Sequence, residues 1–329
     1  MQMKAKVVLT DYVWESLDVE REILDGLADL VPLQMTDPEA FFPEAADCDA
    51  LLNTYGGPFT AEVMARMPRC KIIARYGIGV DTIDLDAATE AGIIVTNNPT
   101  YCIEEVAEHT LAMMLSAARK ITFYDRQVRG GGWAVPPGKP IYRVAGSTAG
   151  LIGFGNIARR VATAASALGM RVLYFDPFVE QGQFDTPGQK AELAEVLEQA
   201  DYLCVHAPLT PQTRGMLNAD AFAQMKRSAV IINCSRGPIV DTVALIEALD
   251  AEEIAGCALD TTDPEPLPED HTLRTRENVI INPHAAWYSE QAMEGLQRGA
   301  PNEVRHVLEG RWPVNVVNRA VKGRNRAGL

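Results

Sequence analysis

One stretch of the chain decides its fold: Ser147-Thr-Ala-Gly-Leu-Ile-Gly-Phe-Gly-Asn-Ile-Ala-Arg-Arg-Val161. It begins as an apolar strand, passes through a glycine turn and opens a helix. Gly153, Gly155 and Ala158 form the pattern G-x-G-x-x-A. The first glycine allows a tight turn, the second lets the backbone approach a pyrophosphate, and the small third residue keeps the helix close to the sheet. Because the helix N-terminus also offers N–H groups to phosphates, the stretch predicts a dinucleotide site.

An acidic residue follows at the spacing that such a site requires. The next apolar strand, Arg171–Phe175, ends at Asp176, which lies 21 residues after Gly155. An acid at this place accepts the hydroxyls of the adenine ribose and repels a 2′-phosphate, so NAD (NADH) is favoured over NADP. The alternative is a glycine turn in another kind of α/β protein, with Asp176 as a loop cap.

Length and composition limit the possible classes of protein. At 329 residues the chain exceeds what one hydrophobic core usually holds, which predicts two domains. It is 47% hydrophobic and 22% charged, as ordinary globular proteins are. The formal net charge of −14 argues against a nucleic-acid-binding protein, because such a protein needs a basic face.

The six cysteines are scattered, and none forms a C-x-x-C pair. Their spacing favours neither a zinc site nor a disulfide framework, so we expect no metal. Several lie in apolar, strand-like runs, which is typical of reduced thiols in a cytoplasmic protein. The N-terminus turns polar too early for a signal peptide, and no apolar run approaches the roughly 20 residues of a membrane helix. We therefore expect a cytoplasmic protein with no membrane partner.

Short apolar strands alternate with helices in the first hundred residues, which predicts a parallel, doubly wound sheet. Helical periodicity covers Trp14–Leu30, and further helices are expected from about Ala61 and up to Ala88. The strands are expected at Ala5–Thr10, Asp49–Asn53, Lys71–Arg75 and Ile93–Thr96.

A second α/β unit begins with a long helix expected over Ile103–Arg119. The final helix, Ser289–Leu308, contains Pro301, which should kink or split it, and is free to pack on the first domain. The basic tail, Val321–Leu329, is expected to be loose. Besides the two strands around the glycine turn, strands are expected at Tyr202–His206, Ala229–Asn233, Ala255–Leu259 and Val279–Asn282.

Three polar residues lie just after consecutive strands of this second unit: Arg236, Glu265 and His284. The carboxyl ends of parallel strands are where ligands bind in open α/β sheets. A guanidinium can hold the carboxylate of a 2-keto acid, His can supply a proton near neutral pH, and a carboxylate can keep that His charged. Each residue alone is compatible with a structural role, but the three together beside a dinucleotide pattern predict hydride-transfer chemistry.

The chain resembles the D-isomer-specific 2-hydroxyacid dehydrogenases over nearly its whole length. The resemblance implies two doubly wound parallel-sheet domains. One is a central Rossmann NAD domain at 100–288, and the other is a split, flavodoxin-like substrate domain at 1–99 plus 289–329. The matching segments are Tyr76–Asp81, Val106–Leu111, Gly150–Ala158 with Asp176, His206–Thr213, Cys234–Gly237, Ala258–Asp260 with Glu265-Pro266, and Pro283-His284.

The same resemblance implies roles for individual residues. Arg236, Glu265 and His284 become the catalytic residues, with His284 as the acid/base, and the backbone at Ile78 and Gly79 contacts the substrate carboxylate. It also implies a homodimer built around an arm at about 120–145. On residues alone, the part of this arm rich in Gly and Pro, Arg129–Val144, reads equally well as a plain surface loop. The residues implied to contact the cofactor are Thr110, Gly153, Gly155, Asn156, Ile157, Asp176, Pro208, Thr213, Cys234 and Asp260.

Within this family the segment Pro283–Ala292 resembles the C-terminal-binding-protein group. In that group a Trp after the catalytic His lines the substrate pocket and an Arg before the glycine turn holds the carboxylate, which implies those roles for Trp287 and Arg75. An apolar ring in the pocket favours a 2-keto acid with an apolar or thioether side chain. The alternatives are interdomain packing for Trp287 and a structural ion pair for Arg75.

We therefore expect an NAD-dependent D-2-hydroxyacid dehydrogenase that works as a 2-keto-acid reductase. The alternative from another class is an NAD(H)-sensing dimeric interaction protein with little dehydrogenase activity. Two departures from the common family pattern bear on the site: Thr261-Thr262 in the loop that carries Glu265, and Pro301 in the last helix.

Overall fold

The computed structural model describes residues 4–329. The chain forms two compact units, one made of the residues up to Cys102 together with Ser289–Leu329, and the other of Ile103–Tyr288. The predicted boundary between residues 99 and 100 lies three residues before the first of these divisions. Within the described residues, no helix combines the length and apolar character needed to cross a membrane.

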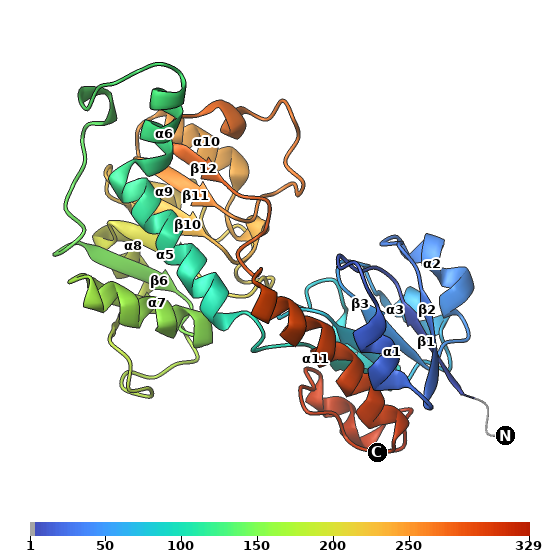
Figure 1. Cartoon of the computed structure of the whole chain (residues 1–329). Helices are drawn as coiled ribbons and strands as arrows, with labels where there is room; N and C mark the ends of the chain where they lie inside the picture. The colour runs from blue at the N-terminus through green and yellow to red at the C-terminus, as the bar shows by residue number, and fades with distance from the viewer. Residues whose placement is uncertain (1–3) are drawn as a thin grey trace. The chain divides into compact units, whose positions relative to one another are not determined.

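The first unit contains a five-stranded sheet in the order β2-β1-β3-β4-β5. All of its strand pairs are parallel, and this order is the flavodoxin-like form of the doubly wound fold. The carboxyl ends of β1, β3 and β4 therefore lie along one edge (Figure 1). The strands are β1 Ala5–Leu9, β2 Ala28–Pro32, β3 Ala50–Asn53, β4 Ile72–Arg75 and β5 Ile94–Thr96.

Helices cover both faces of this sheet. On one face, α11 packs against α1, β3 and β4. On the other, Val8, Leu51 and Ile73 join the apolar residues of α2, α3 and α4 in one buried cluster. The helices are α1 Asp18–Leu24, α2 Pro38–Ala45, α3 Ala61–Ala65, α4 Leu85–Glu90 and α11 Glu290–Leu308.

The helix predicted over Trp14–Leu30 is wrong in its second half. The helix ends at Leu24, Gly26 adopts a left-handed φ of 73°, and the chain continues as edge strand β2. Leu24, Leu27 and Leu30 keep a spacing of three across this junction, so the apolar residues of a helix and of the following strand imitate one longer helix.

The prediction that Pro301 splits the last helix is wrong, because α11 runs unbroken through this buried residue. The alternative, a kink at Pro301, stays a prediction. The prediction of a loose tail is also wrong: Val321 is fully buried in a short 3₁₀ helix, Arg319–Gly323. The Arg326 guanidinium donates to the carbonyls of Met67 and Cys70 at 2.8 and 3.2 Å, so specific hydrogen bonds hold a segment whose composition is that of a mobile tail.

The second unit contains a seven-stranded parallel sheet in the order β12-β11-β10-β9-β6-β7-β8. Counted from β6, this is the Rossmann order 3-2-1-4-5-6 with one further strand. The chain adds β7 and β8 on one side of β6 and β9 to β12 on the other, so the strand order, not the strand direction, reverses between β6 and β9. A dinucleotide binds at the carboxyl ends of the strands at such a reversal. The strands are β6 Thr148–Ile152, β7 Arg171–Phe175, β8 Gln189–Lys190, β9 Tyr202–Val205, β10 Val230–Asn233, β11 Gly256–Leu259 and β12 Val279–Ile281.

Two helical layers enclose this sheet (Figure 1). α5 packs beside α7 in one layer, and α8, α9 and α10 pack together in the other. α6 follows α5 directly and contributes no buried residue to the core. The helices are α5 Ile103–Arg119, α6 Ile121–Arg129, α7 Asn156–Ala167, α8 Leu193–Gln199, α9 Ala219–Gln224 and α10 Thr242–Asp250, with 3₁₀ turns at Pro136–Gly138, Gly237–Ile239 and Thr272–Thr275.

Candidate active site

The glycine turn after β6 has the geometry that a pyrophosphate requires. Gly153 has a φ of 89°, and a Cβ atom there would lie 2.9 Å from the backbone of His206 and Ala207. Gly155 precedes α7, and a Cβ atom there would meet no atom within 4 Å. Ala158, in the first turn of α7, is fully buried. The turn is therefore closely packed behind and open in front of the helix N-terminus, which fits the phosphates of NAD.

Asp176 is joined to this turn by hydrogen bonds. One of its carboxylate oxygens accepts the N–H of Phe154 at 2.8 Å, and the other accepts the N–H of Phe178 at 2.9 Å. The turn and the predicted ribose-binding acid are thus a single unit. Carboxylate oxygens have further lone pairs, so Asp176 can accept ribose hydroxyls while it holds Phe154.

The other predicted cofactor residues lie at the ends of neighbouring strands and on α5 and α7. Asn156 and Ile157 open α7, and the Thr213 hydroxyl donates to the carbonyl of Pro208 at 2.6 Å. Thr110 is buried on α5 and donates to Val106 at 2.7 Å. Burial raises the pKa of the Cys234 thiol to about 12, so that side chain is neutral near pH 7.

Glu265 and His284 meet directly. Nδ1 of His284 lies 2.6 Å from Oε1 of Glu265. Burial raises the pKa of Glu265, but His284, the N–H of Thr262 and the charge of Arg236 together outweigh it, so the pKa of the carboxyl lies below its ordinary value. With Nδ1 in this hydrogen bond, Nε2 is the ring nitrogen left to exchange a proton with a ligand.

Arg236 lies beside this pair because β10, β11 and β12 are neighbours in the sheet. Its backbone carbonyl accepts the side chain of Asn233 at 2.9 Å, and its charge contributes to the lowered pKa of Glu265. A Cβ atom at Gly237 would overlap the backbone of Thr262, so the turn after Arg236 packs tightly on the loop that carries Glu265. The structure therefore brings the three predicted catalytic residues together.

One of the two threonines that depart from the family pattern holds the Glu265 loop. The hydroxyl of Thr262 donates to the carbonyl of Pro264 at 2.9 Å, and its backbone N–H donates to Glu265 at 3.4 Å. Thr261 is buried, and within the described residues its hydroxyl has no hydrogen-bond partner. The substitution therefore adds one side-chain hydrogen bond to the loop, that of Thr262.

The predicted carboxylate-binding residues of the first unit follow β4. Arg75 donates to the carbonyl of Tyr76 at 2.9 Å, Asn98 N–H donates to that of Gly77 at 2.9 Å, and the Asn97 side chain donates to that of Ile78 at 2.7 Å. In a trans peptide the next N–H points opposite to the carbonyl. The N–H groups of Gly77, Ile78 and Gly79 therefore point away from these partners, as a carboxylate site requires.

Gly77 allows this arrangement in two ways. Its φ of 133° lies where side chains are disfavoured, and a Cβ atom there would overlap the guanidinium of Arg75. Arg75 can therefore lie against the turn only because Gly77 has no side chain. Trp287 belongs to the other unit and packs edge-on against Tyr288, with ring centroids 5.6 Å apart.

Residues 111–286 match the NAD-binding domain of the family described as D-isomer specific 2-hydroxyacid dehydrogenase. A glyoxylate reductase from Korarchaeum cryptofilum is 38% identical over 279 residues, 84% of each chain. A D-3-phosphoglycerate dehydrogenase from Methanocaldococcus jannaschii is 35% identical over 95% of this chain and 59% of its own length. The crystal structure of Aquifex aeolicus D-lactate dehydrogenase with NAD and lactic acid superposes with a TM-score of 0.85, at 28% identity over 98% of this chain and 99% of that one.

The chain belongs to the D-isomer-specific 2-hydroxyacid dehydrogenase family. It is accordingly an NAD-dependent oxidoreductase, as the sequence predicts, and its two parallel α/β sheets agree with the predicted fold. The finer resemblance to the C-terminal-binding-protein group stays a prediction.

Two features of the dehydrogenase's site were not predicted. His109 on α5 lies 3.6 Å from Asp260. The motif Val106–Leu111 that contains His109 indicates the family but not this contact. Asn97 and Asn98 hold the turn after β4, and only their place directly after β5 could have pointed to them. Both contacts join segments from different elements, which a local pattern does not record.

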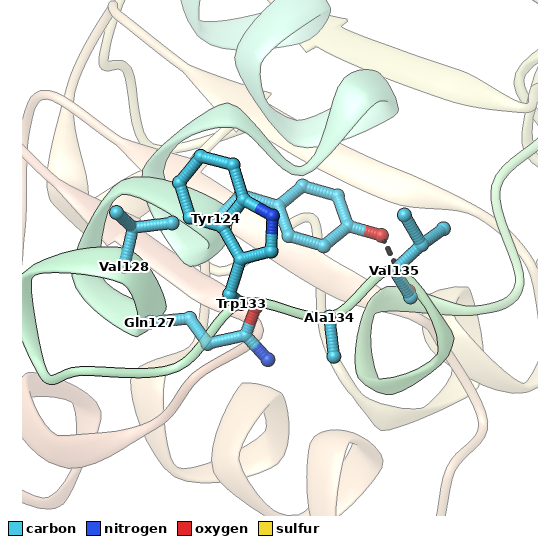
Figure 2. Close-up of a pocket in the computed structure, with 6 residues that line it drawn as sticks. All are labelled: Tyr124, Gln127, Val128, Trp133, Ala134 and Val135. Atoms are coloured by element: carbon cyan, nitrogen blue, oxygen red, sulfur yellow. Dashed lines mark hydrogen bonds between the residues drawn. The ribbon is translucent and has the colours of Figure 1, made fainter.

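The predicted arm carries an apolar cavity of about 320 Å³ (Figure 2). The rings of Trp133 and Tyr124 line it, and the Tyr124 hydroxyl donates to the carbonyl of Val135 at 2.8 Å. Trp133 is 89% exposed. None of the predicted catalytic residues lines this cavity, so it is separate from the candidate active site. The lining residues are Tyr124, Gln127, Val128, Trp133, Ala134 and Val135.

Proposed function

We propose that the dehydrogenase reduces a small 2-keto acid to the D-2-hydroxy acid with His284 as the proton donor. The observation that carries the proposal is the 2.6 Å contact of His284 with Glu265, on strand ends beside that of Arg236. Bound NADH supplies the hydride for the keto carbon. The same residues serve the reverse reaction with the proton moving the other way.

Each catalytic residue has a distinct task in this proposal. Nε2 of His284 gives its proton to the substrate oxygen as that oxygen gains negative charge. Glu265 holds Nδ1 and favours the charged imidazolium by its own negative charge. Arg236 pairs with the substrate carboxylate and polarises the neighbouring carbonyl.

We further propose that the first unit is the substrate domain. Its turn after β4 offers the N–H groups of Ile78 and Gly79 to a carboxylate, next to the guanidinium of Arg75. Trp287 supplies an apolar wall for the substrate side chain. This set favours a 2-keto acid with an apolar or thioether side chain over a phosphorylated one.

A steady-state panel tests this substrate class. Oxidation of NADH would be followed with glyoxylate, hydroxypyruvate, 3-phosphohydroxypyruvate and 4-methylthio-2-oxobutyrate, and the hydroxy-acid product would be resolved on a chiral column. We expect D-products and the highest kcat/KM for the thioether substrate. L-products would contradict the proposal, and a preference for the phosphorylated substrate would contradict the role of Trp287.

We propose in addition that the arm at 120–145 joins two copies of the chain. α6 has no buried residue, and three exposed apolar residues of the arm, Val128, Trp133 and Val135, line the cavity of Figure 2. Such a patch marks a protein interface more often than a bare surface. The exposed apolar residues are Ile121, Val128, Trp133, Val135 and Tyr142.

Light scattering after size-exclusion chromatography tests the dimer. The wild type is expected to elute as a dimer and Trp133→Ser to shift towards the monomer. Phe178→Ser is the matched control, because Phe178 is also 89% exposed but lies outside the arm. A monomeric wild type, or a Trp133→Ser variant that stays fully dimeric at low concentration, would contradict the role of the arm.

A further inference from the structure

Asp260 is a buried carboxylate that holds the loop of His284. Its side chain is 1% exposed and accepts the N–H groups of Ala285 and Ala286 at 2.9 and 3.0 Å. Its backbone carbonyl accepts the N–H of His284 at 2.8 Å. His284 itself has a left-handed φ of 54°, which a non-glycine residue rarely adopts. Three hydrogen bonds from one residue therefore support a strained backbone at the candidate active site.

His109 brings a titratable ring to this carboxylate from α5. Its Nε2 lies 3.6 Å from Oδ1 of Asp260, and within the described residues this buried nitrogen has no hydrogen-bond partner. Cys234 also faces Asp260, but burial and then the charge of Asp260 raise the pKa of its thiol to about 12. His109 is thus the imidazole that faces Asp260 from α5, and the Glu265–His284 pair lies on the adjoining loops.

The topology of the sheet indicates which half of NAD lies near Asp260. The pyrophosphate site follows β6, and Asp176 marks the adenosine side at the end of β7. The other half of the dinucleotide must then extend over the ends of β9, β10 and β11, on the opposite side of β6. Asp260 directly follows β11. The nicotinamide ring is charged in NAD⁺ and neutral in NADH, so a carboxylate on this side attracts NAD⁺ more strongly.

We propose that the proton on His109 sets the relative affinity of the enzyme for NAD⁺ and NADH. A charged His109 neutralises Asp260 and weakens the attraction for NAD⁺, whereas a neutral His109 leaves the full negative charge to favour NAD⁺. This role rests on the proposed orientation of the cofactor in the active site. It makes His109 a positioning residue that acts through Asp260 and touches no reacting atom. Coupling of this kind is reciprocal, so NAD⁺ binding expels the proton from His109.

Binding measurements across pH test the proposal without turnover. The dissociation constants of NAD⁺ and NADH would be measured for the full chain from pH 5.5 to 9 by calorimetry, in buffers of different ionisation enthalpy. In the wild type we expect the ratio Kd(NAD⁺)/Kd(NADH) to fall about fivefold or more as the pH rises. His109→Gln should hold the ratio at its high-pH value, and His109→Lys at its low-pH value. The extra proton released on NAD⁺ binding should disappear in both variants.

His306→Gln is a matched control, because His306 also faces a buried carboxylate, with Nδ1 3.9 Å from Glu303, in the other unit of the fold. It should keep the wild-type slope. A slope that persists in His109→Gln but vanishes in His284→Gln would overturn the proposal, as would a flat wild-type ratio with both cofactors bound. If the wild type bound neither cofactor, that result would contradict the proposed dehydrogenase function as well as the role of His109.

Discussion

The two parallel sheets of this dehydrogenase end in different kinds of chemistry. At the carboxyl ends of β10–β12 the proposed functional groups are the side chains of Arg236, Glu265 and His284. After β4 the proposed groups are backbone N–H groups around Ile78, oriented by hydrogen bonds to the opposite carbonyls. Side-chain chemistry can be read from residue types, whereas a backbone site depends on which way each peptide points. Changing one group at a time on either edge tests this difference between the two sheets.

The largest expected effect lies on the side-chain edge. His284→Gln removes the proton donor but keeps a group that can hydrogen-bond with Glu265. We expect kcat for 2-keto-acid reduction to fall about 100-fold or more, as loss of a general acid usually causes. NADH binding, measured by fluorescence titration, should survive. Near-normal turnover would mean that His284 is not the proton donor, and that the two edges do not differ in the way proposed.

Asp176, after β7 of the same sheet, should give the next largest effect, because we propose that it recognises the ribose and it also holds the glycine turn. Asp176→Asn should weaken discrimination against NADPH about tenfold by removing the charge that repels a 2′-phosphate. Its amide oxygen can still accept from Phe154. Asp176→Ala should lose the same discrimination and also weaken NADH binding, since the turn loses its acceptor. Unchanged discrimination in both variants, in steady-state kinetics with the two cofactors, would contradict the ribose assignment.

On the backbone edge the matching change is Asn97→Ala. It removes the 2.7 Å hydrogen bond to the carbonyl of Ile78 and frees that peptide to turn. Loss of one such bond costs about 1 kcal/mol, so KM for the keto acid should rise about three- to tenfold while kcat stays close to that of the wild type. Asn325→Ala is the control, because the Asn325 amide also bonds a backbone carbonyl, that of Lys322, at 2.8 Å. An equal change of kcat and KM in Asn97→Ala would point to general destabilisation instead.

The sequence predicts much of the second unit because its parallel strands are buried on both faces and read as continuous apolar runs. β7 and α5 have the predicted bounds, and β6 lies in the stretch predicted to begin as a strand. Edge strands are harder: β2 follows α1 without a break in apolar spacing, and β8 has only the two residues Gln189–Lys190. Where one face of a strand is solvated and the strand is short, its pattern no longer differs from that of a loop or helix.

The candidate site divides along the same line. The proposed catalytic side chains could be placed at strand ends from the sequence alone, and the structure adds that Glu265 contacts His284 directly. His109 could not be connected with Asp260, because about 150 residues separate them in the chain. Asn97 could not be recognised either, since its partner is a carbonyl whose direction depends on the fold of β4 and β5.

The smallest expected effect concerns the charge of Glu265. Burial raises the pKa of this carboxyl, and His284, Thr262 and Arg236 together lower it further than burial raises it, so the net pKa is below the ordinary value. A carboxyl with a lowered pKa stabilises the folded chain above its unfolded pKa and loses this contribution as the pH falls through its folded pKa. The wild type should therefore melt above Glu265→Gln at pH values above about 5, with the difference closing below about pH 4.

Salt separates this contribution from an ordinary surface pair. The pKa of Glu309 is also lowered, but there the side-chain hydrogen bonds of Arg305 and Arg311 are the largest causes and burial a lesser one, whereas burial is the largest single cause at Glu265. The melting difference of Glu309→Gln should therefore shrink in 0.5 M salt, because charges that interact through solvent are screened. That of Glu265→Gln should shrink less, because burial acts more strongly on Glu265 than on Glu309. Thermal melts at two salt concentrations check this, and equal salt sensitivity would mean that the side-chain edge behaves as a surface ion pair rather than as a preorganised acid–base site.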